Sequence, residues 1–137
     1  MESLGFTGTQ EGVTPEQAQA LVTAAKEASP REFHHGMCIG ADHFMGQVLG
    51  HVGAIIHGHP PTNTSKMAKC LVDVMHAPKD YLARNRDIVL CSQALLAAPK
   101  GEETQRSGTW STVRFARKLG RPVIICWPNG STTRENV

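Results

Sequence analysis

The sequence has no long apolar run, no secretion signal and no large net charge. No apolar stretch approaches the length that crosses a bilayer, which excludes a membrane-spanning helix. The opening residues MESLGFTGTQ contain no basic segment followed by an apolar run, so we expect a cytoplasmic protein without a membrane partner. The formal net charge is only +2 and no basic run is present, so we do not expect nucleic acid as a partner.

Closely spaced cysteine pairs are also absent. The four cysteines are scattered, which excludes the spacing of a zinc knuckle or a redox pair. Inside a cell they would stay reduced. We interpret them as small buried hydrophobic residues: Cys38, Cys70, Cys91 and Cys126.

The chain does contain short apolar runs that alternate with amphipathic segments. Its 137 residues, 40% of them hydrophobic, suffice for one domain with its own core, over residues 1–137 with a loose tail at 128–137. The alternation predicts a doubly wound, Rossmann-like α/β domain with about five mostly parallel strands flanked by helices. The expected strands are residues 3–7, 32–35, 53–57, 94–98 and 122–127, and the expected helices are residues 15–29, 41–51, 66–76, 81–92 and 107–119.

Ligands of such sheets bind beyond the carboxyl ends of the strands. Ser107, Gly108 and Thr109 begin a predicted helix, where free N–H groups, two hydroxyls and the helix dipole favour a phosphate. The alternative is that Ser107 or Thr109 only caps the helix. A glycine-bearing turn at residues 8–12 follows the first strand and allows a phosphate or ribose to approach the backbone.

Arginines and one tryptophan near these segments have two interpretations each. Arg84 and Arg86 do not share a helix face, so one would reach a phosphate while the other pairs with an acid, or both are solvated charges. Trp110 can stack on a base, although packing against the sheet is favoured in the first turn of a helix.

Histidines are frequent and suggest a metal site. Strand alternation places His57 and His59 on one side, but no third ligand appears at a convincing spacing, so we predict no metal site. His35 and His59, at the ends of neighbouring strands, are expected to contact the ligand instead.

Together, four segments resemble the SLOG superfamily, the Rossmann-like group that includes DNA-processing protein A and the Lonely Guy phosphoribohydrolases. The segments are GFTGT at 5–9, HHGMCIGAD at 34–42, ARNRDIV at 83–89 and RSGTWSTVRFARKLGRPV at 106–123. The resemblance implies a five-stranded Rossmann-like fold, a phosphate-recognising glycine turn, frequent dimerisation, and ligands that are nucleotides, their derivatives or nucleic acid.

The resemblance favours binding over catalysis. In the phosphoribohydrolases the Gly-Thr pair belongs to a motif that ends in a catalytic glutamate, whereas here Gly108-Thr109 is followed by Trp110-Ser111-Thr112. The carboxylate that would stabilise a ribosyl transition state is missing from this helix. Substitutes from neighbouring loops are the catalytic candidates Asp42, Glu102 and Glu103.

We therefore expect a homo-oligomer that senses or sequesters a nucleotide or nucleotide-derived phosphate ligand, without a cofactor, as a phage protein directed against nucleotide signalling would. The alternatives are a nucleotide N-glycosidic-bond hydrolase or transferase, and a structural module with an empty apolar cleft. The expected ligand-binding residues are Thr7, Gly8, Thr9, His35, Gly36, Gly40, Ala41, Asp42, His59, Arg84, Asn85, Arg86, Pro99, Lys100, Ser107, Gly108, Thr109 and Trp110.

Overall fold

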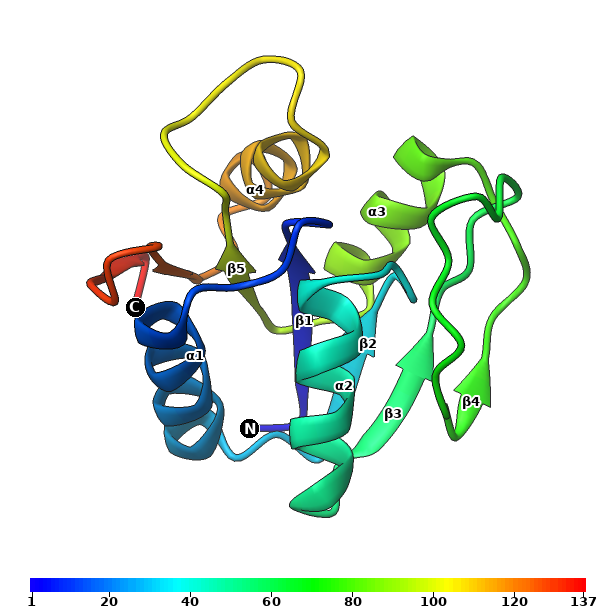
Figure 1. The fold of residues 1–137 in the computed structure, drawn as a ribbon, viewed down its shortest axis with the longest axis horizontal. Helices are drawn as coiled ribbons and strands as arrows, with labels where there is room; N and C mark the ends of the chain where they lie inside the picture. The colour runs from blue at the N-terminus through cyan, green and yellow to red at the C-terminus, as the bar shows by residue number, and fades with distance from the viewer.

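The computed structural model describes residues 1–137 and shows a seven-stranded sheet with four helices (Figure 1). The strand order is β4-β3-β2-β1-β5-β6-β7, and all neighbours are parallel except β6 with β7. The strands are β1 Ser3–Gly8, β2 Glu32–His35, β3 Ile55–Gly58, β4 Val74–Met75, β5 Ala94–Ala98, β6 Val123–Cys126 and β7 Thr132–Glu135. The predicted mostly parallel α/β fold is confirmed, but with more strands than the predicted five.

Helices cover both faces of the sheet, as predicted for a doubly wound fold. They are α1 Pro15–Ala28, α2 Ala41–His51, α3 Tyr81–Leu90 and α4 Gly108–Lys118. Helix α1 begins as its sequence indicates, because the Thr14 side chain accepts the N–H of Gln17 in a capping box and Pro15 takes the first helical position. None of the four helices is long and apolar enough to cross a membrane.

Strand alternation divides the core between the two faces. Leu4 and Phe6 of β1 pack in the larger cluster with α1 and α2, whereas Leu95 and Ala97 of β5 pack with α4 on the other face. On that second face α3 and α4 lie mainly over β1, β5 and β6. No helix covers β2, β3 and β4 there to the same extent.

The chain reverses its direction across the sheet between β1 and β5. It winds outward from β1 to β4, then returns through α3 to β5 on the other side of β1. The loops that follow β1 and β5 therefore diverge, which opens a crevice at their carboxyl ends.

The helix predicted at residues 66–76 is not formed. The carbonyl of Lys66 accepts the N–H of Ile39, and the N–H of Ala68 donates to Met37, so this backbone pairs with the loop after β2 instead of with itself. The short strand β4 ends this segment and pairs with β3.

The prediction of a loose tail is wrong for residues 132–135. A turn at Asn129 and Gly130, where the Asn129 side chain accepts the N–H of Ser131, reverses the chain after β6. Strand β7 then pairs antiparallel with β6, and Glu135 binds Arg117 of α4 at 2.8 Å. Asn129 and Gly130 are typical turn residues, but the sequence did not indicate that the segment after them would pair with β6.

Candidate ligand-binding cleft

A cleft of about 1070 Å³ lies at the carboxyl ends of β1 and β5, where the chain reverses its winding. We call it the switch-point cleft. Only 5 of its 23 lining residues are hydrophobic, so many hydrogen-bonding groups border the space available to a ligand. It is built from the loops after β1, β2 and β5 and from the first turns of α3 and α4.

The first turn of α4 forms one wall of the switch-point cleft. Ser107 caps the helix by accepting the N–H of Trp110 at 3.2 Å. The N–H groups of Gly108 and Thr109 make no hydrogen bond within the protein. A Cβ atom added at Gly108 would meet no atom within 4 Å. Ser107 therefore acts as a cap while two further N–H groups have no partner in the protein, so the two predicted roles are compatible.

The turn after β1 packs tightly beneath the cleft. A Cβ atom on Gly8 would lie 2.5 Å from that of Ala41, so only glycine lets α2 approach here. The Thr9 carbonyl accepts the N–H of Ala41, and Thr9 Oγ1 accepts that of Glu11. Residues 7–9 line the cleft, whereas Gly40 and Ala41 support this turn from outside the lining.

Arg84 is a buried cation on the cleft floor. Its guanidinium donates to the carbonyls of Gly36 and, at 3.1 Å, His59, which ties together the loops after β2 and β3. Its Nε donates to Asn85 Oδ1 at 2.7 Å. No carboxylate forms an ion pair with Arg84, although only 5% of its surface is exposed. An anion in the cleft would therefore experience a charge that no salt bridge neutralises.

Arg86 has a different environment from Arg84. It lies outside the switch-point cleft, between α3 and α4, with its guanidinium 5.2 Å from the centre of the Phe115 ring. The predicted division, in which one arginine pairs with an acid, is wrong, because neither Arg84 nor Arg86 makes an ion pair.

Asp42 lines the cleft but already holds a loop in place. Its Oδ2 accepts the N–H groups of Gly36 and Cys38, both at 3.1 Å. Burial raises the pKa of Asp42 to about 6, against the opposing effect of these hydrogen bonds and of Arg84. One oxygen of this carboxylate is thus committed to structure.

The two glutamates that the sequence singled out are separated by the fold. Glu102 lines the cleft, whereas Glu103 lies outside it and binds Arg117 and Arg114 at 3.0 and 3.1 Å. The hydrogen bonds from these arginines lower the pKa of Glu103, which makes it a poorer proton acceptor.

Further cations border the opening. Lys100 binds Glu11 at 2.8 Å, which joins the loops after β5 and β1 across the cleft. Lys66 and Arg106 also line the cleft and make no ion pair. Lys66 was not anticipated, because it comes from the irregular segment between β3 and α3, whose path the sequence does not reveal. Tyr81 begins α3 and was expected to be helical, but it was not identified as a residue of the site.

Trp110 is part of the core, as favoured from the sequence. It is 2% exposed, its Nε1 donates to the Gly101 carbonyl at 3.2 Å, and its ring contacts that of Trp127. Its indole forms cleft wall and is not free to swing onto a base.

Most of the expected ligand-binding residues meet at this cleft, but six do not line it. Thr7, Gly8, Thr9, Gly36, Asp42, Arg84, Asn85, Lys100, Ser107, Gly108, Thr109 and Trp110 line the cleft, whereas His35, Gly40, Ala41, His59, Arg86 and Pro99 do not.

The two histidines and Pro99 lie elsewhere for clear reasons. His35 is fully buried against Gly46 of α2, its Nε2 has no partner, and burial lowers its pKa to about 4. The carbonyl of His59 accepts a hydrogen bond from Arg84, but its ring lies against His34, with Nε2 of His59 2.8 Å from Nδ1 of His34. The Pro99 carbonyl accepts from Gln17 of α1 at 2.9 Å.

Comparisons with known proteins bear on the fold of this chain. No family model and no curated protein sequence matches it. Among solved structures, it is similar to a molybdenum cofactor binding protein from Rippkaea orientalis, with a TM-score of 0.71, 24% identity, and coverage of 92% of this chain and 76% of the other. It is also similar to the molybdenum cofactor carrier protein of Chlamydomonas reinhardtii, with a TM-score of 0.66, 22% identity, and coverage of 90% and 75%.

The chain also shares its fold with DNA processing protein A from Helicobacter pylori, described as binding single-stranded DNA. The TM-score is 0.60 at 19% identity, over 90% of this chain and 64% of that protein. These solved structures share the α/β fold that the resemblance to the SLOG superfamily implied.

Proposed function

We propose that this protein senses or sequesters a nucleotide or nucleotide-derived phosphate ligand in the switch-point cleft and does not transform it. The observation that carries the proposal is that Gly108 and Thr109, whose N–H groups have no partner in the protein, line the same cleft as the buried guanidinium of Arg84, which has no salt bridge. Backbone donors at a helix N-terminus, backed by a fixed positive charge, are the elements of a phosphate site.

The remaining lining suits the rest of such a ligand. Thr7, Thr9 and Asn85 offer hydroxyl and amide groups for a sugar, and Tyr81 offers an aromatic ring beside Arg84. Lys100 lies at the opening, held only by its exposed pair with Glu11, so it can exchange this partner for a phosphate.

A molybdenum cofactor is a specific candidate within this ligand class. Two solved structures with this fold are described as binding or carrying it. The first turn of α4, which lines the cleft, suits an anionic group of either ligand.

The alternative function is cleavage or transfer of an N-glycosidic bond. Asp42 favours it, because this carboxyl borders the cleft and its pKa of about 6 suits proton transfer near neutral pH. Two observations weigh against it: one Asp42 oxygen is occupied by two N–H groups, and Thr112 of α4 donates to the Gly108 carbonyl where the phosphoribohydrolase motif has its glutamate.

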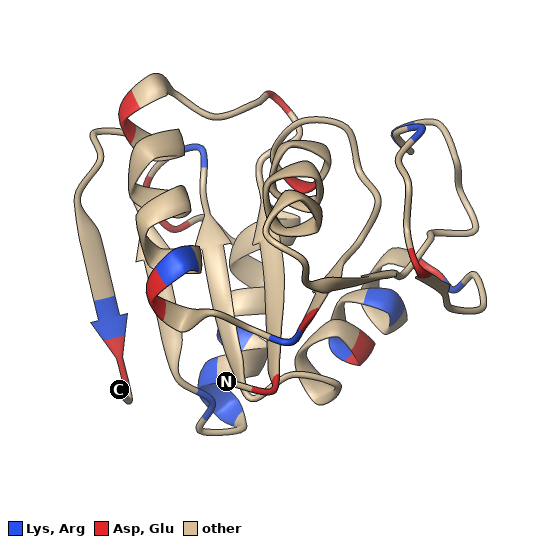
Figure 2. Cartoon of the chain, turned by 90° about the horizontal axis from the view of Figure 1, so that it is seen from below, with Lys and Arg blue, Asp and Glu red and all other residues tan.

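Nucleic acid is not expected in the cleft. Acidic and basic residues are interspersed along the chain, without a continuous basic segment (Figure 2). Binding of a single-stranded oligonucleotide that falls steeply with salt would contradict this expectation and align the chain with DNA processing protein A.

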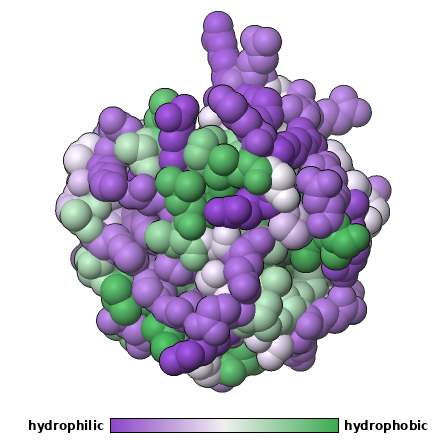
Figure 3. Space-filling model, turned by 180° about the vertical axis from the view of Figure 1, so that it is seen from behind, coloured by the Kyte–Doolittle hydropathy of each residue, from purple (hydrophilic) through white to green (hydrophobic).

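A homo-oligomer remains our proposal for the assembly. Leu82 and Leu90 of α3 are each 55% exposed, which leaves apolar surface for a second copy of the chain. Seen from behind, apolar side chains form separate patches among hydrophilic ones (Figure 3), so a small interface is expected. Light scattering that gives the mass of a monomer would contradict the proposal.

The test is mass spectrometry of small molecules released from natively purified protein, followed by calorimetry with nucleotides, the same compounds without phosphate, and a molybdenum cofactor preparation. We expect one phosphate-bearing class to bind and to be recovered intact after incubation. Release of a free base or sugar phosphate would favour the enzyme, and failure of every compound to bind would refute the proposed function.

A further inference from the structure

Four histidines meet on the sheet face opposite α1 and α2. His34 lies on β2, His57 on β3, His59 just after β3 and His76 just after β4. The parallel register places His34 beside His57, and alternate residues of a strand share a face. We call these four residues the histidine cluster; none of them lines the switch-point cleft.

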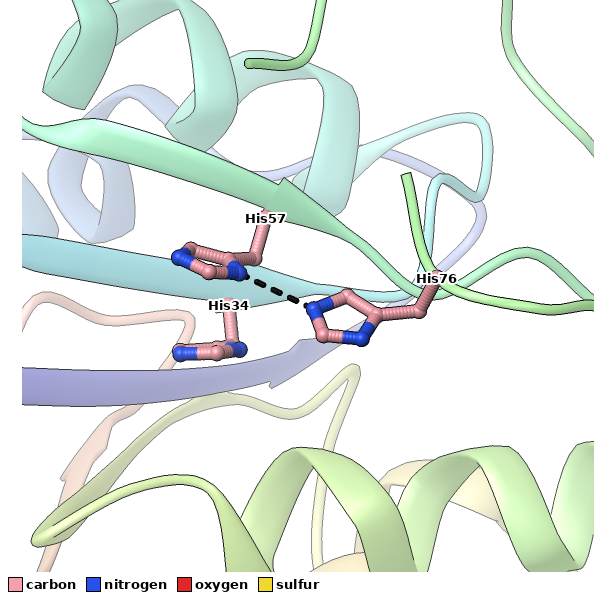
Figure 4. Close-up of side chains that lie close together, drawn as sticks. All are labelled: His34, His57 and His76. Carbon is pink, nitrogen blue, oxygen red and sulfur yellow. Dashed lines mark hydrogen bonds between the residues drawn. The ribbon is translucent and has the colours of Figure 1, made fainter. Parts of the chain in front are cut away.

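The rings form two stacked pairs that face each other through their nitrogens. The His34 and His57 centroids are 4.1 Å apart, and those of His59 and His76 are 4.0 Å apart. His34 Nδ1 lies 2.8 Å from His59 Nε2, and His57 Nδ1 lies 2.9 Å from His76 Nε2. Figure 4 shows His76 pointing toward His57, with the ring of His34 alongside.

We propose that His34, His57 and His76 bind a divalent transition-metal ion of the kind that imidazole ligands prefer, such as Zn²⁺. One nitrogen of each residue can be chosen so that all three lie within 4.8 Å of one another. A tetrahedral zinc ion with Zn–N bonds of about 2.0 Å holds its nitrogens roughly 3.3 Å apart. That spacing lies between the hydrogen-bonded distance of 2.9 Å and the 4.8 Å limit, so small ring movements suffice.

A carboxylate already orients one of the three ligands. Glu32 Oε1 lies 2.6 Å from His57 Nε2, so this nitrogen donates to Glu32 and leaves the lone pair of Nδ1 directed at the other rings. A histidine held by a carboxylate in this way is a recurrent second-shell arrangement at metal sites.

The state and exposure of the rings also suit metal binding. Burial and the neighbouring rings lower the pKa of His34 to about 4, so its ring is neutral and can donate a lone pair at pH 7. His57 and His76 are partly exposed, which provides an entry path from solvent. A hydrogen-bonded stack of neutral rings without a metal is the competing interpretation, and the experiment below separates the two.

A second, overlapping group consists of His34, His59 and Cys91. Both groups contain His34, so the two groups cannot each bind a metal ion at the same time. Cys91 is exposed, not buried as interpreted from the sequence, but partial desolvation still raises the pKa of its thiol, which opposes formation of the thiolate ligand. No carboxylate orients His59. These differences favour the three histidines.

The test is titration of tag-free protein with Zn²⁺ by calorimetry and chelator competition, with Co²⁺ as a spectroscopic substitute. We expect one ion per chain and the intense visible bands of low-coordinate cobalt. His76→Gln should weaken binding by at least about tenfold, and Glu32→Gln by about 10- to 100-fold, the range for loss of a second-shell carboxylate.

Two control variants complete the experiment. His51→Gln removes an exposed histidine from the end of α2, far from the cluster, and Cys91→Ser removes the alternative ligand; both should bind Zn²⁺ as the unmodified protein does. The inference is overturned if the unmodified protein shows no saturable binding, if His76→Gln binds equally well, or if Cys91→Ser causes the loss. Circular dichroism of each variant verifies the fold.

Discussion

The switch-point cleft and the histidine cluster gather polar side chains on the same sheet but handle charge in opposite ways. The cleft contains a buried guanidinium without a salt bridge and two free helix N–H groups. The cluster consists of stacked rings, and burial lowers the pKa values of His34 and His59 so that they stay neutral at pH 7. A helix N-terminus at the edge of the sheet suits an anion, whereas neutral imidazoles from neighbouring strands in register suit a cation.

One residue belongs to both regions. The carbonyl of His59 accepts a hydrogen bond from Arg84, while its ring lies 2.8 Å from His34 in the cluster. The switch-point cleft and the histidine cluster are therefore neighbours, and we expect each to bind its ligand independently of the other.

The largest expected effect is on stability, from Arg84→Met. The change leaves the buried carbonyls of Gly36 and His59 without a donor, and each such loss costs about 1 to 3 kcal/mol, so we expect a loss of about 4 kcal/mol. Arg86→Met is the control on the same helix, where loss of the contact with Phe115 should cost less than about 1 kcal/mol. Urea unfolding measures both, and equal midpoints would contradict the role given to Arg84.

Asp42→Asn should change how stability depends on pH. The pKa of Asp42 is raised from 3.8 to about 6 in the folded protein, so the stabilisation of its neutral form is present below about pH 4 and is lost as the pH rises through 6. The shift of about two pKa units corresponds to about 3 kcal/mol. Asparagine stays neutral, so the free energy of unfolding of Asp42→Asn, relative to that of the unmodified protein, should increase by that amount between pH 4 and pH 7.

Parallel stability curves for the two proteins would show that the Asp42 carboxyl is not held neutral by the fold. Unfolding by urea at several pH values provides the comparison.

Gly108→Glu should weaken ligand binding in the switch-point cleft and leave Zn²⁺ binding by the histidine cluster unchanged. The new side chain enters open space, so the fold is retained, but its charge opposes a phosphate at the free N–H groups. Repulsion between unit charges near a protein surface is about 4 kcal/mol at 4 Å, so we expect at least about a hundredfold loss of ligand affinity. Zn²⁺ affinity should not change.

Gly50→Glu is the matched control, because Gly50 lies in the last turn of α2 and a Cβ there makes only ordinary contact with Ile56. His76→Gln is the reciprocal test and should leave phosphate affinity intact. Loss of both activities in either Gly108→Glu or His76→Gln would show that the regions are one site.

The smallest expected effect is coupling between the regions through His59. Saturation with Zn²⁺ should change the dissociation constant of the phosphate ligand by no more than about threefold, and the ligand should change the Zn²⁺ constant by the same factor. Calorimetric titrations with and without the second ligand measure this factor. A change above about tenfold would mean that Arg84 and His59 move together on binding.

The switch-point cleft was largely predictable because it follows from local chemistry and one topological rule. Gly8 at the end of β1, and Ser107, Gly108 and Thr109 at the start of α4, lie where strand and helix ends were expected. Lys66 was missed because its segment pairs with the loop after β2, and no local signal encodes that partner. The position of His76 beside the other histidines was missed because the sequence predicted a helix at 66–76 instead of strand β4, which pairs with β3.

By itself, the sequence determined the four helices, the five strands β1, β2, β3, β5 and β6, and the caps of α1 and α4, because apolar periodicity and capping residues act within a few residues along the chain. Only the tertiary structure decided that Arg84 ties two loops together, that the tail forms β7, and that histidines from residue 34 to residue 76 share one face. The physical reason is that strand register and loop pairing bring together residues far apart in sequence, and these contacts depend on the packing of the whole sheet.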